Sequence, residues 1–150
     1  MARDRFEDYL KLRLERCHED LNYARRLLEQ GGYRLSINRS YYAIFHIATV
    51  VLATLSIEPT RQSGLEAAFH QHLIRPGLIE PEYGSIYRRA RRWREDADYS
   101  LSTKFTEETA QNILIEAERF VARLERYLRE QGLMAGEEET DATEEIGRRR

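Results

Sequence analysis

The stretch INRSYYAIFHIATVVL, residues 37–52, decides the fold class of this chain. It is among the most apolar runs in a sequence of which 33% of the residues are charged. A helix that is apolar on every side has to be packed among other helices. We therefore expect an all-α fold, an up-and-down bundle of about five helices, with this segment well buried. The run nevertheless contains an arginine and a histidine, Arg39 and His46.

Apolar residues recur at helical spacing along almost the whole chain, and no segment shows the two-residue period of a strand. The pattern predicts helices at about residues 3–29, 35–55, 64–74, 81 to 98–100, and 106–131. The glycine pair 31–32 and Pro59 separate the first three helices. We expect Ser36, Ser63 and Thr106 to assist helix starts, because side-chain oxygens can accept from the free N–H groups there.

The chain divides into one helical domain, residues 1–131, and an acidic tail, residues 132–150, which we expect to be disordered. Apolar segments are too short to span a membrane, and the N-terminus lacks the apolar core of a signal peptide. The single cysteine, Cys17, suits a reducing compartment. We therefore expect a cytoplasmic protein that does not enter membranes.

The sequence has no glycine-rich phosphate loop, no nucleophile elbow and no zinc-type cysteine and histidine spacing. His70 and His72 are two residues apart, so on a helix they point in nearly opposite directions and suit a shared metal ion poorly. We expect no cofactor and no metal.

Arg39 and His46 are seven residues apart, which on a helix is within about 20° of two whole turns, with a rise of about 10 Å. Both therefore project from one line of the helix, away from the residues that we expect to face the core: Ile37, Tyr41, Ile44, Ala48, Val51 and Leu55. Ala43, Ile47 and Val50 lie on the side of the pair and also need cover. We expect a second copy of the chain to supply it, as a homodimer.

A histidine can transfer protons near neutral pH, and an arginine matches the oxygens of a phosphate. Together they could cleave RNA without a metal ion, because a ribose hydroxyl, once deprotonated, attacks the adjacent phosphate. An alternative stays open on spacing alone. Arg39 could pair with Asp96 or Asp98 while His46 fills a gap in the core.

The segment YRRARRWR, residues 87–94, holds five arginines in eight positions, although the net charge of the chain is −2. Arg88, Arg91, Arg92 and Arg94 are our candidates for RNA-backbone contacts, with Trp93 or Tyr87 available for base stacking. The alternative is a solvated surface paired with acidic neighbours.

Three motifs resemble the HEPN superfamily, specifically small prokaryotic members encoded beside minimal nucleotidyltransferases. They are NRSYYAIFH (residues 38–46), SGLEAAFHQHLI (63–74) and RRWREDADYS (91–100), and the likeness covers roughly residues 5–130. The first contains an arginine and a histidine separated by six residues, at the long end of the family's range of four to six.

This resemblance implies a helical bundle that dimerises to build a composite site, and metal-independent endoribonuclease activity centred on Arg39 and His46. It also implies a toxin whose antitoxin partner is a nucleotidyltransferase. Ser40, Tyr42, Asp98 and Tyr99 are the candidates for supporting or orienting the pair.

Two positions depart from the family pattern. Ser40 stands where many active members have Asn, Asp or His, and Ala48 stands where one toxin subgroup has a tyrosine that the antitoxin modifies. A non-catalytic HEPN subunit that binds nucleotide or RNA and partners a nucleotidyltransferase is therefore the alternative function. A structural helical adaptor is a third.

Overall fold

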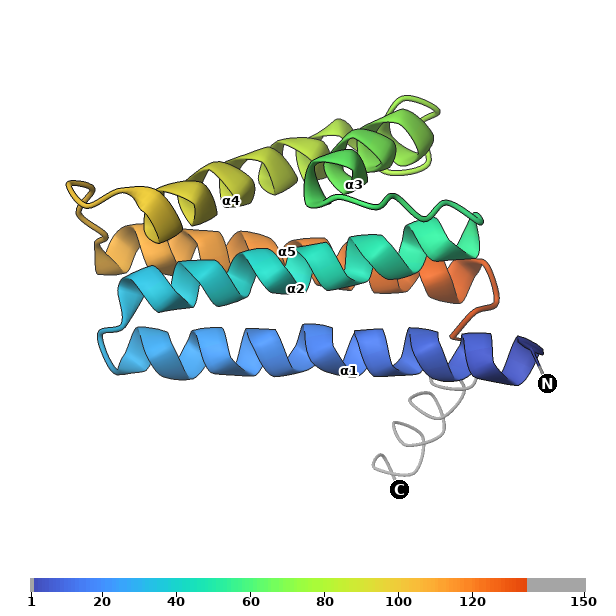
Figure 1. Ribbon diagram of the computed structural model, residues 1–150, viewed down its shortest axis with the longest axis horizontal. Helices are drawn as coiled ribbons and strands as arrows, with labels where there is room; N and C mark the ends of the chain where they lie inside the picture. Colours follow the sequence, from blue (N-terminus) through green and yellow to red (C-terminus); the bar gives the residue numbers. More distant parts are fainter. Residues whose placement is uncertain (1, 135–150) are drawn as a thin grey trace, which may run out of the picture.

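The computed structural model describes residues 2–134, and within this range the chain is an all-α bundle without strands. Four long helices and one short helix build it (Figure 1). The elements in chain order are α1 (Ala2–Glu29), α2 (Tyr33–Thr54), α3 (Gln62–Phe69), the π-helical turn η1 (His70–Ile74), α4 (Pro81–Tyr99) and α5 (Glu107–Glu130). The expected fold class is confirmed. Most of the expected tail, residues 135–150, lies outside the described residues.

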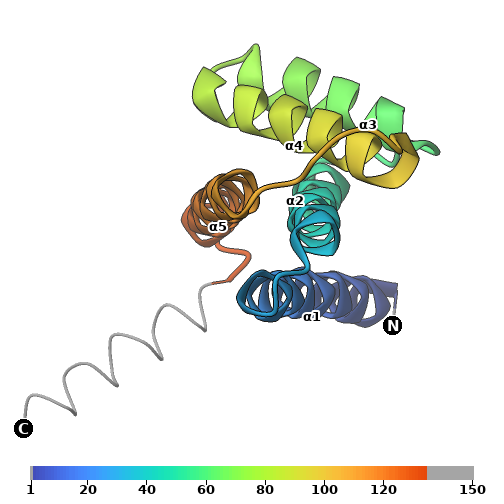
Figure 2. The same cartoon turned by 90° about the vertical axis from the view of Figure 1, so that its left-hand side faces the viewer.

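The apolar helix α2 lies at the centre of the bundle and contacts α1, α3, α4 and α5. Viewed along the bundle, α1 lies on one side of α2, α4 with α3 on the opposite side, and α5 beside it (Figure 2). Within the described residues, no helix is long and apolar enough to cross a membrane.

The turn between α1 and α2 is tighter than expected, because Gly31 adopts a left-handed conformation with φ 79°. As a result α2 begins at Tyr33, two residues earlier than expected. Ser36 does not assist the helix start. Its buried Oγ donates a 2.8 Å hydrogen bond to the Ala24 carbonyl of α1, which ties the two helices together.

Of the caps predicted for α3 and α5, the first is wrong and the second is confirmed. Helix α3 begins at Gln62 after Arg61, so the prediction that Ser63 caps it is wrong. Helix α5 is capped as expected, because the Thr106 side chain accepts a 3.1 Å hydrogen bond from the Thr109 amide.

The argument that an apolar face of α2 needs a second chain is wrong. Ala43, Ile47 and Val50 are at most 1% exposed within a single chain. The long helix α1 runs beside α2 along this face and covers it, with Cys17 and Leu21 buried in the same core cluster. The covering partner is therefore the chain's own first helix.

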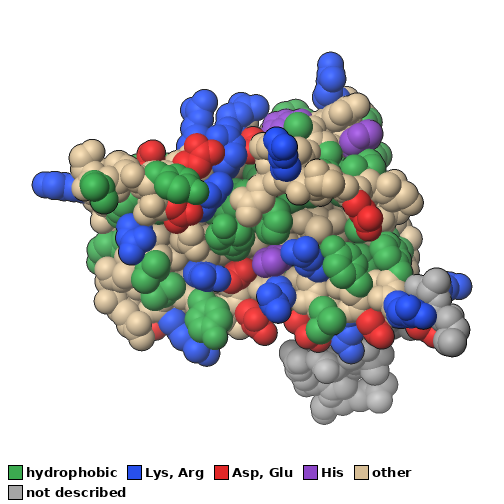
Figure 3. Space-filling view, in the orientation of Figure 1, with side chains coloured by type: hydrophobic (Ala, Val, Ile, Leu, Met, Phe, Trp, Pro, Cys, Tyr) green, Lys and Arg blue, Asp and Glu red, His purple; other side chains and the backbone are tan. Residues whose placement is uncertain are grey.

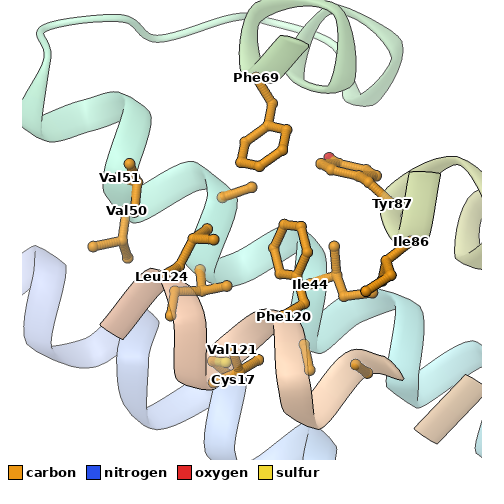
Figure 4. Packing of buried hydrophobic residues seen from close by; sticks show 14 of the residues in the cluster. Cys17, Ile44, Val50, Val51, Phe69, Ile86, Tyr87, Phe120, Val121 and Leu124 are labelled. Atoms are coloured by element: carbon orange, nitrogen blue, oxygen red, sulfur yellow. The ribbon is translucent and has the colours of Figure 1, made fainter. Parts of the chain in front are cut away.

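Aromatic side chains from three elements fill the other side of the core (Figure 4). Phe69, Tyr87 and Phe120 are fully buried, with ring centroids 5.3–5.8 Å apart. This cluster joins α3, α4 and α5 to α2. It fixes the bundle and leaves the face formed by α1 and α2 for polar side chains.

Candidate active site

Arg39 and His46 lie on the face where α2 meets α1, and both approach one carboxylate of α1. A guanidinium nitrogen of Arg39 donates a 3.2 Å hydrogen bond to Oδ1 of Asp20. Nε2 of His46 lies 3.4 Å from Oδ2 of the same residue. On its other side, Nδ1 of His46 is 2.9 Å from a guanidinium nitrogen of Arg13. The four side chains form one continuous network, which we call the Arg–His quartet.

The quartet follows from the matching spacing of two pairs on adjacent antiparallel helices. Arg13 and Asp20 are seven residues apart on α1, as Arg39 and His46 are on α2. Each pair therefore projects from one line of its own helix. Because the helices run in opposite directions, Arg13 meets His46 at one end of the network and Asp20 meets Arg39 at the other.

The partner of Nδ1 fixes the tautomer of His46. Arginine carries only donors, so Nδ1 must accept from Arg13 and is unprotonated. The ring proton then sits on Nε2, facing the Asp20 carboxylate. Arg13 and Asp20 together hold the imidazole in one orientation.

The quartet is buried at its centre and open on one side. The side chains of Asp20 and His46 are 9% and 13% exposed, whereas that of Arg39 is 47% exposed. On the corresponding face of the molecule, basic side chains lie along α1 and around a histidine near the middle (Figure 3). A phosphate could therefore reach Arg39 without any rearrangement of the backbone.

Arg13 itself is held by aromatic rings. Its guanidinium carbon lies 5.7 Å from the ring centroid of Tyr9 and 5.8 Å from that of Phe45. Its Nε donates a 3.3 Å hydrogen bond to the Tyr9 hydroxyl. Cation–π contacts at this distance restrict the side chain but are weak enough to be exchanged for a phosphate.

Comparison with known proteins identifies the family of this chain. The HEPN domain model matches residues 10–127, which include all four members of the quartet. This chain belongs to the HEPN family.

Several proteins of other organisms are similar to this chain over most of its length. A protein of Methanocaldococcus jannaschii named "Putative toxin MJ0605" is 38% identical over 117 residues, covering 78% of this chain and 87% of the relative. A UPF0332 protein of Thermotoga maritima is 27% identical over 126 residues, covering 84% and 93% of the two chains. A second Methanocaldococcus jannaschii protein, "Putative toxin MJ0142", is 24% identical over 133 residues, covering 89% and 90%.

The candidate supporting residues within the NRSYYAIFH motif, Ser40 and Tyr42, lie around the quartet rather than in it. Ser40 is fully buried, and its Oγ has no hydrogen-bond partner among the described residues. Tyr42 is half-buried and packs edge-on against Tyr41 and Phe45, with centroids 5.2 Å and 5.9 Å away. Tyr42 thus supports Phe45, which in turn contacts Arg13.

Of the candidates on α4, Asp98 belongs to a separate network, next to Arg39 in the N-terminal half of α2. Asp98 accepts a 2.9 Å hydrogen bond from Asn38 and a 3.3 Å bond from Arg94. Asp98 therefore holds Asn38, the residue before Arg39. Arg39 itself pairs with Asp20 and not with Asp98. Tyr99 is 77% exposed at the end of α4.

The arginine cluster of α4 divides into paired and exposed members. Arg91 donates hydrogen bonds to Glu66 and Glu95, at 2.5 Å and 3.0 Å. Arg94 pairs with Asp98, and its guanidinium lies 4.8 Å from the Tyr41 centroid. Arg88 and Arg92 are exposed.

The aromatic candidates for base stacking are also divided. Tyr87 is fully buried in the core, where burial raises the pKa of its hydroxyl, so its assignment to an RNA surface is wrong. It faces inward because it packs on Phe69 and Phe120. Trp93 is half-buried and packs against Phe105, with centroids 6.2 Å apart.

Sequence reasoning missed Asp20 and Arg13 as members of the site. The signal was present, because Arg13, Cys17, Asp20 and Ala24 recur at steps of four, three and four on α1. Two charged residues on a stripe that also carries buried residues indicate a buried polar network. Among the described residues, no group of three or more His, Cys, Asp or Glu side chains is placed to hold a metal ion.

Proposed function

We propose that this HEPN protein is a metal-independent endoribonuclease that acts as a toxin, with Arg39 and His46 as its catalytic residues. The observation that carries the proposal is the convergence of both side chains on Asp20 at a face where Arg39 remains half-exposed. An acid–base group and a phosphate-binding group thus lie side by side at the surface.

The proposed reaction is an internal transesterification of RNA. A proton leaves the ribose 2′-hydroxyl, the 2′-oxygen bonds to the adjacent phosphorus, and the bond from phosphorus to the 5′-oxygen breaks. Arg39 stabilises the charge that develops on the phosphoryl oxygens. His46 transfers a proton to or from the reacting oxygens. The products are a 2′,3′-cyclic phosphate and a 5′-hydroxyl end.

The base role of His46 requires a free lone pair on the imidazole. Nδ1 offers one only when Arg13 moves away, and an RNA phosphate is a competing acceptor for that guanidinium. Substrate binding would then release Nδ1. The acid role requires the imidazolium, which carries a proton on both ring nitrogens, so it too requires Arg13 to leave Nδ1.

The biological assignment follows the relatives. Two of the related chains carry the name toxin, and toxins of this kind need an antitoxin. We propose a nucleotidyltransferase as that partner. The exposed Arg88 and Arg92 extend the basic surface of α4 for RNA, while Arg91 and Arg94 contribute less because carboxylates already pair with them.

The homodimer remains part of the proposal because the family resemblance implies it. The apolar face that first suggested a second chain is covered by α1. Within the structure, support for a dimer therefore comes from Arg39 alone. Its half-exposed guanidinium could contribute to a site shared between two copies. Light scattering of the purified protein measures this, and a monomer at working concentration would remove the composite site from the mechanism.

The decisive experiment is cleavage of mixed RNA by the purified protein in the presence of EDTA. We expect cleavage by the wild type and a loss of at least a hundredfold in Arg39→Ala and His46→Ala. Arg39→Lys keeps the charge but loses the forked donor set, so its cleavage rate should lie between those of the wild type and Arg39→Ala.

Matched controls separate a catalytic effect from a general one. Arg34→Ala removes an exposed arginine of the same helix, which donates a long 3.4 Å hydrogen bond to the Ala97 carbonyl. His72→Ala removes a half-buried histidine of η1. Both should cleave like the wild type, and circular dichroism should show every variant folded. Full cleavage by His46→Ala would end the catalytic assignment.

One observation favours a second function, a non-catalytic HEPN subunit that binds nucleotide or RNA beside a nucleotidyltransferase. Arg39 already donates to Asp20, and His46 already accepts from Arg13, so the polar groups of the pair have partners within the chain, as in a purely structural cluster. This function predicts RNA binding without cleavage under the same conditions, so a single assay distinguishes the two.

A further inference from the structure

We infer that the cleft beside the Arg–His quartet is a nucleobase-binding subsite, which takes an unpaired base of the RNA strand next to the scissile phosphate. This inference builds on the proposed function, but its central test measures binding and does not depend on cleavage. The cleft has a volume of about 640 Å³. That size is typical of sites that hold a small organic ligand.

The walls of the cleft carry the chemistry that a base needs. Three aromatic side chains line it, Phe6 and Tyr9 from α1 and Phe45 from α2. Phe6 and Tyr9 are 39% and 37% exposed, so their rings are accessible from solvent. Unpaired bases stack on such rings whatever their sequence, because every base has a π face.

The lining of the cleft also carries basic side chains. Arg5, Arg13 and Arg61 line it, with Glu58 as the acidic lining residue. A nucleotide combines a flat aromatic base with an anionic phosphate, and this lining matches both parts. In Figure 3, hydrophobic side chains are exposed among basic ones where the N-terminal half of α1 meets the C-terminal end of α2.

Arg13 connects the cleft with the quartet. Its guanidinium lies over Tyr9 and Phe45 inside the cleft, and it donates to Nδ1 of His46. A base that enters the cleft therefore lies beside the same arginine that a neighbouring phosphate would draw away from His46. Tyr9 and Phe45 become positioning residues for the RNA strand, since the base that stacks on them fixes which phosphate reaches Arg39.

The test uses a short single-stranded oligonucleotide of 2′-deoxyribose containing 2-aminopurine, which has no 2′-hydroxyl and cannot be cleaved. Stacking quenches its fluorescence. We expect the full-length protein to quench it and Tyr9→Ala to weaken binding roughly 5- to 100-fold. Tyr9→Phe should bind like the wild type, because the ring remains.

The chain supplies a matched control on the same helix. Tyr23 is 52% exposed and has an arginine over its ring, Arg26 at 5.8 Å, as Tyr9 has Arg13. Tyr23→Ala lies outside the cleft and should bind the oligonucleotide unchanged. Equal losses in Tyr9→Ala and Tyr23→Ala would show a general aromatic surface and overturn the subsite.

The remaining outcomes separate this inference from the proposed function. Unchanged binding by Tyr9→Ala, with cleavage still lost in His46→Ala, would overturn the subsite and leave the nuclease. Tyr9-dependent quenching in a protein that cleaves no RNA would support the subsite and reject the nuclease. If Tyr9→Ala instead changes the oligomeric state by light scattering, the cleft is a protein interface and the inference is wrong.

Discussion

Arg13 on α1 donates a 2.9 Å hydrogen bond to Nδ1 of His46 on α2. The bond joins two residues 33 positions apart in the chain. It makes the protonation pattern of the histidine depend on a side chain outside the HEPN motif.

In the folded protein we expect the His46 imidazole to carry its proton on Nε2, because the Nδ1 lone pair accepts from Arg13. Nitrogen-15 NMR of the ring measures this directly. In Arg13→Met combined with Asp20→Ala both partners of the ring are lost, and we expect a mixture of the two neutral tautomers. A ring that already shows both tautomers in the wild type would contradict the geometry.

Asp20→Asn should separate RNA binding from turnover. The substitution keeps a hydrogen-bond acceptor for Arg39 but removes a nearly buried negative charge, 9% exposed, beside the phosphate site. Because that charge repels phosphate, we expect tighter RNA binding. Because it also orients His46, we expect kcat to fall roughly tenfold to a hundredfold. Single-turnover cleavage at saturating protein measures the second effect and an RNA titration the first. Glu19→Gln, an exposed neighbour on α1, is the control and should change neither quantity.

Glu80 and Arg123 should give the protein a pH-dependent contribution to stability. Arg123 of α5, with its side chain 8% exposed, donates to both Glu80 carboxylate oxygens and to the Leu78 carbonyl, which anchors the segment before α4. This hydrogen bond holds the pKa of Glu80 below its ordinary value of 4.5. A carboxyl group whose pKa is lowered by folding stabilises the folded protein at pH values above its unfolded-state pKa. This contribution is lost as the pH falls through the pKa of the folded state.

We therefore expect Glu80→Gln to lower the free energy of unfolding near neutral pH by up to about 1 kcal/mol, since the carboxylate is half-exposed. The difference from the wild type should vanish well below pH 4.5. Urea unfolding at both pH values measures it. Glu82→Gln breaks a more exposed pair with Arg119 and should cost less. A deficit of Glu80→Gln that persists in acid would refute the linkage.

Gly84 and His70 should be energetically coupled. A Cβ on Gly84 would lie 2.6 Å from Cε1 of His70, closer than atoms tolerate. Gly84→Ala should therefore destabilise the wild type, by about 1 kcal/mol or more. In a His70→Ala background the clash is absent, and the same change should stabilise α4 by roughly 0.5–1 kcal/mol, because alanine favours helix. Thermal unfolding of the four proteins gives the coupling. Additive effects would show that the ring moves aside without cost.

Much of the fold follows from local patterning. The apolar run of α2, the glycine pair before it and Thr106 before α5 predict a helical bundle with nearly correct boundaries. The starts of α2 and α3 were the exceptions, each two residues before the predicted position. The Ser36 side chain that sequence reasoning assigned to a cap instead makes a tertiary bond to the Ala24 carbonyl.

The sequence by itself determined that Arg39 and His46 share one line of a helix, because a seven-residue spacing is nearly two turns whatever surrounds it. Only the tertiary structure decided what faces that line. Laying α1 antiparallel along α2 buries Ala43, Ile47 and Val50 without a second chain and brings Asp20 and Arg13 to the pair. Helical period is a local property of the backbone, whereas the choice of neighbour depends on how all the apolar faces are buried at once.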